Sequence, residues 1–121
     1  MEKKKTLVLG ASENPARYSN LAIKRLIGQQ HPVVAIGKRK GAVGPVEIGT
    51  EHEPFPGIDT VTIYLNPLRQ EEYYDYILSL HPKRIIFNPG AENEELADLA
   101  RENGIQPVEA CTLVLLSTGQ F

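Results

Sequence analysis

Two polar stretches follow apolar runs and carry residue types that bind phosphate. The first is Gly10-Ala11-Ser12-Glu13-Asn14-Pro15, with Arg17 and Ser19 close behind it. Backbone N–H groups at a helix start favour an anion, and hydroxyl, amide and guanidinium groups add donors. We therefore predict a phosphate site formed by Gly10, Ala11, Ser12, Asn14, Arg17 and Ser19. Ser19 alone could instead cap the following helix, which is the commoner role for such a residue.

The second stretch is Gly37-Lys38-Arg39-Lys40, which ends another apolar run. An NAD-binding Rossmann unit places an acidic residue here to hold the ribose hydroxyls. This chain has three adjacent cations instead, and their mutual repulsion favours a nearby anion. A phosphate on a ribose suits both lysine and arginine, so we predict that Lys38, Arg39 and Lys40 bind one. The alternative is a solvated surface loop.

The first turn helps to choose between two phosphorylated nucleotides, NADP and coenzyme A (CoA). The Rossmann motif G-x-G-x-x-G uses its second and third glycines to let a pyrophosphate lie close to the backbone. Only Gly10 is present here, and Ser12 and Pro15 disfavour that close approach. The residues therefore favour CoA, while a small NADP-dependent oxidoreductase stays open. Tyr64 is the only strand-borne polar group that could serve such an enzyme.

Two further polar turns contain proline. Asn66-Pro67 and Asn88-Pro89-Gly90 are turns by their residue types, and at strand ends they would also line the ligand crevice. The histidines and the cysteine are candidate metal ligands: His31, His52, His81 and Cys111. They show no metal-binding spacing, and no motif marks a nucleophile. We therefore expect no catalytic residue and no metal site.

The elements that position these residues alternate between strands and helices. Apolar runs predict strands at residues 7–9, 33–36, 60–65, 84–87 and 106–109, with a short extra strand at 46–48. Helical spacing predicts helices at 19–28, 67–80 and 92–103, the last stopped by Gly104. This alternation predicts an α/β, Rossmann-like three-layer sandwich. Its sheet would be mostly parallel, with five strands or slightly more in the order 3-2-1-4-5. No element is assigned to residues 110–121.

Composition limits the classes of function. The chain has 121 residues, with 41% hydrophobic and 23% charged residues, which predicts one globular domain over residues 1–121. Its net charge of -2 disfavours nucleic-acid and membrane-surface partners, which require a basic excess. A single cysteine permits no internal disulfide and suggests a cytoplasmic protein. Oligomeric state and protein partners are left open.

These stretches together resemble the small stand-alone CoA-binding proteins, which share their domain with the N-terminal part of the succinyl-CoA synthetase α subunit. The resemblance covers residues 5–111 and rests on Gly10-Ala11-Ser12, Asn14-Pro15, Arg17, Ser19, Lys38-Arg39-Lys40-Gly41, the aspartate of "GIDTVTIYLNP", the stretch "NPGAENEELADLARENGI" and Cys111.

The resemblance implies a Rossmann-like fold that binds the ADP part of CoA or an acyl-CoA. Gly10, Ser12, Arg17 and Ser19 would face phosphates, and Lys38 and Lys40 would meet the 3′-phosphate. Asn66-Pro67 and Asn88-Pro89-Gly90 would line the rest of the site. The family's synthetases also use a separate domain with a phosphorylated histidine, for which 121 residues leave no room. We therefore expect a CoA-binding protein without its own catalytic machinery.

Two stretches depart from the family pattern. Gly37-Lys38 stands where the family usually has Asn-Pro or Ser-Pro, and His31-Pro32 stands where it usually has a glycine. A third interpretation rests on these departures: a protein that keeps the fold, has lost the ligand and acts by protein interaction alone.

Overall fold

A seven-stranded sheet forms the centre of the computed structural model, which describes residues 2–121. The strand order is β3-β4-β2-β1-β5-β6-β7, and every pairing except β3 with β4 is parallel. The prediction of a mostly parallel, Rossmann-like sheet is therefore confirmed. The strands are β1 (Thr6–Ala11), β2 (Val33–Gly37), β3 (Gly41–Val43), β4 (Val46–Gly49), β5 (Thr60–Ile63), β6 (Arg84–Phe87) and β7 (Gln106–Glu109).

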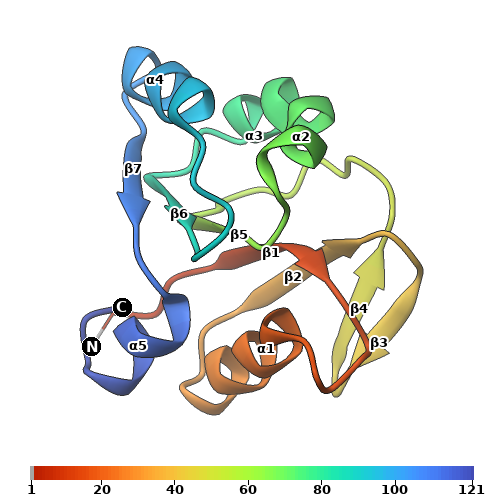
Figure 1. The fold of residues 1–121 in the computed structure, drawn as a ribbon. Coiled ribbons are helices and arrows are strands. Elements are labelled where there is room, and N and C mark those ends of the chain that lie inside the picture. Colours follow the sequence, from red (N-terminus) through yellow and green to blue (C-terminus); the bar gives the residue numbers. More distant parts are fainter. Residues whose placement is uncertain (1) are drawn as a thin grey trace.

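Helices cover both faces of the sheet, which gives three layers (Figure 1). Two helices lie on one face, α1 (Tyr18–Gly28) and α5 (Thr112–Ser117). On the other face lie α2 (Pro67–Gln70), the 3-10 turn η1 (Glu71–Tyr73), α3 (Tyr74–Ser79) and α4 (Glu94–Glu102). Across residues 2–121, every helix is too short or too polar to cross a membrane.

The core has two halves because side chains alternate along the strands. On β1, Leu7 and Leu9 pack into the cluster beneath α3 and α4, with Ile77 and Leu96. Val8 points to the opposite face and packs with Ile23 and Leu26 of α1. All seven of these side chains are fully buried. Apolar burial on both faces is typical of a parallel sheet between helix layers and holds the strand ends in register.

The strand order needs one correction. With the five main strands numbered along the chain, order 3-2-1-4-5 places residues 60–65 beside the second strand. In the structure, β5 instead pairs with the other side of β1, Thr6 lying opposite Thr60. The place beside β2 belongs to β4, whose pairing with β3 forms a hairpin. Residues 41–43, predicted as loop, form one strand of that hairpin.

Some helix boundaries also differ from the prediction. Residues 67–80 do not form one helix, because η1 separates α2 from α3. The unassigned tail contains α5, which packs on α1 and closes the lower layer. Gly104 stops α4 in the left-handed region as predicted, with φ of 73°. After α1, the residue with the positive φ is Gln30, with φ of 65°.

Candidate functional site

One cavity of about 810 Å³ opens at the carboxyl ends of the central strands. Its walls come from the segments that follow β1, β2, β5 and β6, so residues from four parts of the chain meet there. This is the edge where α/β sheets bind ligands. All the predicted site residues line the cavity except Pro67 and Asn88. Contact between any of the predicted site residues and a ligand stays a prediction.

Gly10 lets the chain leave the sheet directly above its neighbour β5. Its φ of 95° is in the left-handed region, and a Cβ there would lie 3.1 Å from the backbone carbon of Tyr64. The pairing of β1 with β2 also shifts register between Leu9 and Ala11. A glycine is therefore required at this turn, as the strand-to-loop pattern suggested.

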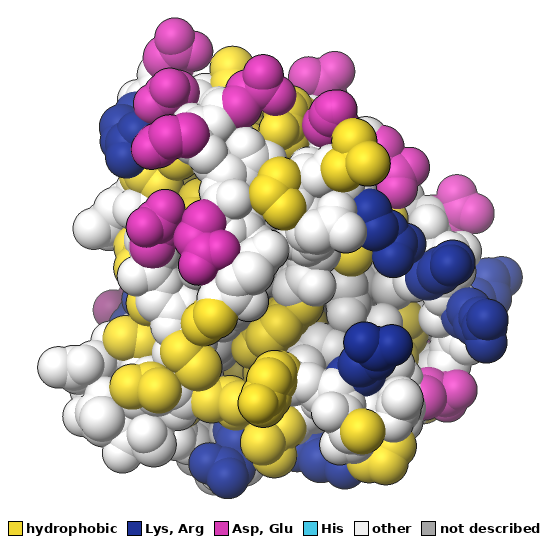
Figure 2. Space-filling view, viewed as in Figure 1, with side chains coloured by type: hydrophobic (Ala, Val, Ile, Leu, Met, Phe, Trp, Pro, Cys, Tyr) yellow, Lys and Arg dark blue, Asp and Glu magenta, His cyan; other side chains and the backbone are white. Residues whose placement is uncertain are grey.

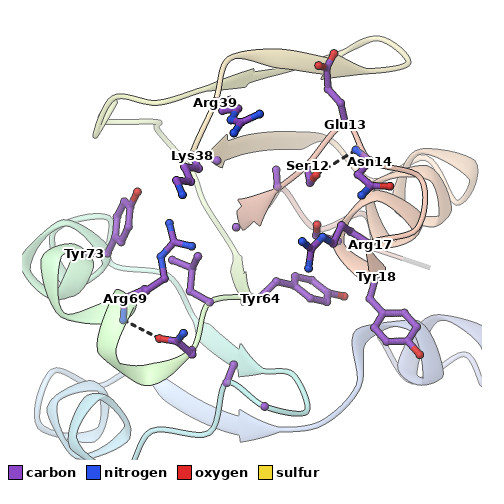
Figure 3. A pocket seen from close by; sticks show the side chains of 18 of the residues that line it. Ser12, Glu13, Asn14, Arg17, Tyr18, Lys38, Arg39, Tyr64, Arg69 and Tyr73 are labelled. Carbon is purple, nitrogen blue, oxygen red and sulfur yellow. Dashed lines mark hydrogen bonds between the residues drawn. The ribbon is translucent and has the colours of Figure 1, made fainter.

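Side chains of the first loop hold its own backbone in shape. Ser12 Oγ accepts a hydrogen bond from Asn14 N at 3.1 Å, and Asn14 Oδ1 accepts one from Ala16 N at 2.9 Å. Asn20 Nδ2 donates to the carbonyl of Ser12 at 3.0 Å. Figure 3 shows Ser12, Asn14 and Arg17 together on one side of the cavity. The loop is thus preorganised beside the start of α1.

The start of α1 has no side-chain cap. Arg17 occupies the cap position, and its side chain makes no capping hydrogen bond. Ser19 lies inside the helix and is buried, so the alternative interpretation of Ser19 as a cap is wrong. An 11-residue helix therefore directs uncapped N–H groups and the positive end of its dipole towards the cavity.

A carboxylate fixes the basic loop beside the first loop. Glu13 Oε2 accepts a hydrogen bond from Ala42 N at 2.9 Å. Gly41 makes room for this contact, because a Cβ there would lie 2.3 Å from Glu13 Cδ. Sequence reasoning missed Glu13 as a lining residue. An acid is not expected in a phosphate-binding loop, and its bond to Ala42 N can be seen only when the position of the β3–β4 hairpin is known.

Five cations line the cavity: Arg17, Lys38, Arg39, Lys40 and Arg69. Within residues 2–121, none of the five forms a salt bridge. Lys and Arg side chains gather on the right of the face in Figure 2, whereas acidic side chains lie mostly along the top, over α4 and the helices beside it. Although the net charge of the chain is -2, unpaired positive charge is concentrated at this cavity.

The opposite wall comes from the segment after β5. Asn66 caps α2, its Oδ1 accepting a hydrogen bond from Arg69 N at 3.0 Å. Pro67 is the first residue of α2 and does not line the cavity. Arg69 and Tyr73 line the cavity instead. Burial raises the pKa of the Tyr73 phenol, Glu72 adds to that rise, and Arg69 opposes it. Asn66 of the predicted turn thus lines the cavity, and so do Arg69 and Tyr73, which follow the turn.

Asn88 lies behind the cavity wall rather than in it. Its Nδ2 donates to Thr62 Oγ1 at 2.7 Å and to the Ile63 carbonyl at 2.9 Å. Its Oδ1 accepts from Thr112 N at 2.9 Å. The side chain is buried, and these bonds tie β6 to β5 and to the start of α5. Its donors and acceptor are used within the fold, whereas the adjacent Pro89 and Gly90 do line the cavity.

Tyr64 lines the cavity, and Figure 3 shows it beside Arg17 and Tyr18 at the start of α1. Burial raises the pKa of its phenol to about 12. Its buried hydroxyl lies beside Thr62 and Thr112, whose hydroxyls bond to each other at 2.8 Å, and it has no hydrogen-bond partner of good geometry within residues 2–121. Such a phenol is neutral near pH 7 and cannot act as a base there.

His31, His52, His81 and Cys111 do not line the cavity. Cys111 precedes α5 and is half-buried, outside the cavity lining. No group of three or more His, Cys, Asp or Glu side chains in residues 2–121 could hold a metal ion. The fold and this cationic crevice define a Rossmann-like protein whose binding edge suits an anionic, nucleotide-sized ligand.

Comparison with known proteins then gives the family. Residues 4–117 match the family model described as CoA binding domain, and the chain belongs to that family. The resemblance noted in the sequence is thereby confirmed. A search of curated proteins finds no match.

Solved structures share the fold. A crystal structure of an uncharacterised protein is 51% identical, with a TM-score of 0.97 and 100% of both chains covered. A hypothetical protein from Pyrococcus horikoshii OT3 is 23% identical, with a TM-score of 0.86 over 97% of this chain and 84% of that one. A Thermus thermophilus protein is 21% identical, with a TM-score of 0.83 over 98% and 91%. The latter two support the fold alone.

Proposed function

We propose that residues 1–121 act as one domain that binds CoA or an acyl-CoA through its ADP and phosphate part. The observation that carries this proposal is the set of five unpaired cations around one crevice, beside an uncapped helix start. Phosphates are the ligands that such groups favour. Membership of the CoA binding domain family supports CoA as the nucleotide. With one cysteine in the chain, we place this function in the cytoplasm.

Each phosphate of CoA has a proposed partner. The pyrophosphate lies at the first loop, near Ser12, Arg17 and the first N–H groups of α1. The 3′-phosphate lies near Lys38 and Lys40, which leave the end of β2 with exposed side chains. The looser turn after Gly10 supports this arrangement, because Ser12 supplies a hydroxyl where a dinucleotide motif has glycine.

We further propose that the domain binds without transforming its ligand. Glu13 and Tyr64 are the two lining groups best suited to acid–base catalysis. Glu13 already accepts a hydrogen bond from Ala42 N, and burial raises the pKa of the Tyr64 phenol to about 12. The Tyr64 hydroxyl is also buried beside Thr62 and Thr112, which disfavours the oxidoreductase alternative in which it would serve a nicotinamide. A carrier or sensor of CoA fits these groups better.

The test is calorimetric titration with CoA, dephospho-CoA and NADP. We expect CoA to bind more tightly than dephospho-CoA by about 5- to 150-fold, the scale of a charge-assisted contact. A Lys38→Ala/Lys40→Ala variant should lose that difference. The matched control is Lys3→Ala/Lys5→Ala, which removes the same charge from lysines that bond to Gln29 and Pro56 carbonyls away from the cavity.

Each proposed contact can fail separately. Equal affinity for CoA and dephospho-CoA would show that the basic loop does not bind the 3′-phosphate. Tighter binding of NADP would favour the oxidoreductase. No binding of any nucleotide at millimolar concentration would leave interaction with another protein as the function, and the present proposal would be wrong.

A further inference from the structure

Three aromatic rings stack beside the cavity. His52, from the segment between β4 and β5, packs against two tyrosines, one in η1 and one in α3. Its ring centroid is 4.7 Å from that of Tyr73 and 4.9 Å from that of Tyr76, with interplanar angles of 34° and 31°. These are favourable stacking distances. Tyr76 is buried, and its hydroxyl donates to the Glu53 carbonyl, so the inner end of the stack is fixed.

Tyr73 is the outer ring of this stack and the only one that lines the cavity. His52 packs against its ring, and the half-buried Tyr73 side chain borders the crevice. Figure 3 shows Tyr73 at the edge of the cavity, with Lys38 and Arg69 between it and the loop of Ser12 and Arg17. A supported aromatic ring therefore borders the cationic part of the site.

We infer that Tyr73 is the stacking platform for the nucleobase of the bound nucleotide, with Arg69 beside it. This inference rests on the proposed function and adds the group that selects a nucleotide over a simpler phosphate ester. Aromatic rings and guanidinium planes both stack on bases, whose π-faces are flat and apolar. The stack with His52 and Tyr76 holds the platform before the ligand arrives, which reduces the ordering cost of binding. Adenine would become the fourth ring.

The location also matches the proposed phosphate sites. The 3′-phosphate belongs to the ribose that carries the adenine, so its partners must lie close to the base. Lys38 lines the same end of the cavity as Tyr73 and Arg69 (Figure 3). A base on Tyr73 thus leaves the phosphates among the cations, and the pantetheine part extends towards Tyr64 and α1.

The experiment compares CoA with 4′-phosphopantetheine, which lacks the base, on three variants. We expect Tyr73→Leu to weaken CoA by about 5- to 100-fold, the range for base–aromatic stacking, and to leave 4′-phosphopantetheine unchanged. Tyr73→Phe should retain CoA affinity within about twofold, since the ring is kept. Tyr74→Leu is the matched control, because Tyr74 bonds to Asn93 outside the cavity.

A spectroscopic readout makes the contact direct. NMR of CoA bound to the wild-type protein should show upfield ring-current shifts of the adenine H2 and H8 protons, and these should disappear with Tyr73→Leu. If CoA binds but Tyr73→Leu has no effect, or weakens both ligands equally, the inference is overturned and the proposed function stands. If the wild-type protein binds neither CoA nor adenosine 3′,5′-bisphosphate, the inference about Tyr73 and the proposed function are both overturned.

Discussion

At the residue scale, Gly37 shows how tightly the strand ends pack under the site. A Cβ on Gly37 would lie 2.3 Å from the carbonyl oxygen of Ala11 and 3.0 Å from Ile48 Cγ2. The carbonyl belongs to the backbone of β1 and cannot rotate away. Strands β1 and β2 therefore hold the first loop and the basic loop at a fixed separation, and no side chain fits between them.

We predict that Gly37→Ala lowers the free energy of unfolding by about 1–3 kcal/mol, the usual cost of overpacking. Urea denaturation measures this change in the free energy of unfolding. The matched control is Gly49→Ala on the neighbouring β4, where a Cβ would meet nothing within 4 Å. That variant should stay within about 0.5 kcal/mol of the wild type. Equal stability of the two variants would show that the close approach of β1 and β2 is not rigid.

Sequence could predict the residues whose role follows from local pattern. Gly10, the polar loop to Ser19 and the three cations after β2 all line the cavity, because each directly follows a strand whose apolar run is visible. Arg69 and Tyr73 were missed, since they lie one turn inside the next helical segment and only the helix orientation brings them back to the site. The buried position of Asn88 behind the lining could not be predicted, because its partner Thr112 is distant in sequence.

At the element scale, the connection between α1 and β2 carries a buried histidine. His31 is 4% exposed, and its ring meets the edge of Phe121 with centroids 5.0 Å apart. Its Nδ1 accepts a hydrogen bond from Lys4 N at 3.0 Å, and its Nε2 has no partner within residues 2–121. Burial lowers the pKa of His31 below its ordinary value of 6.5, and Lys3, Lys4 and Arg84 lower it further.

The sign of the resulting pH dependence follows from this lowered pKa. Below about pH 6.5 the unfolded chain binds a proton at residue 31 that the folded chain does not, so the unfolded state binds more protons. We expect stability to be constant above this pH and to fall as pH drops below it. Urea denaturation of His31→Gln between about pH 5 and pH 8 should show a weaker decline than the wild type.

His81 provides the control for that experiment. It is exposed and has a φ of 49°, a conformation that asparagine tolerates. His81→Asn should keep the wild-type pH profile. If His31→Gln and the wild type lose stability in parallel, the buried ring is not the titrating group that matters.

Short elements were the hardest to predict. The hairpin of β3 and β4 was partly assigned to loop because its three- and four-residue strands follow a basic, glycine-rich run. Helix α5 has six residues and no side-chain cap, and its position depends on packing against α1. By contrast, the pattern of α4 was clear, because Leu96, Ala97 and Ala100 form a buried stripe and Gly104 ends it. Tertiary contacts decide elements whose local signal is weak.

At the scale of the whole molecule, the charge is unevenly distributed. The chain carries more acidic than basic residues, yet the cavity gathers five cations and only one acid, Glu13. Electrostatic attraction of a phosphorylated ligand to such a site weakens as salt screens it.

We predict that CoA affinity falls by about tenfold between about 0.05 M and 0.5 M NaCl, since the screening length shortens over this range. The Lys38→Ala/Lys40→Ala variant should show a shallower dependence in the same titrations, because fewer cations contribute. An affinity insensitive to salt would mean that the cations do not contact the phosphates.

The parallel sheet has a consequence for the time course of folding. Thr6 pairs with Val33 on one side and with Thr60 on the other, and Thr60 pairs in turn with Arg84. Each pairing closes a long loop, which costs entropy before it gains contacts, so such sheets assemble slowly. Because the crevice is lined from four of these distant segments, it exists only once the sheet is complete. A bound nucleotide therefore prolongs the lifetime of the native state by slowing unfolding, and does not hasten refolding.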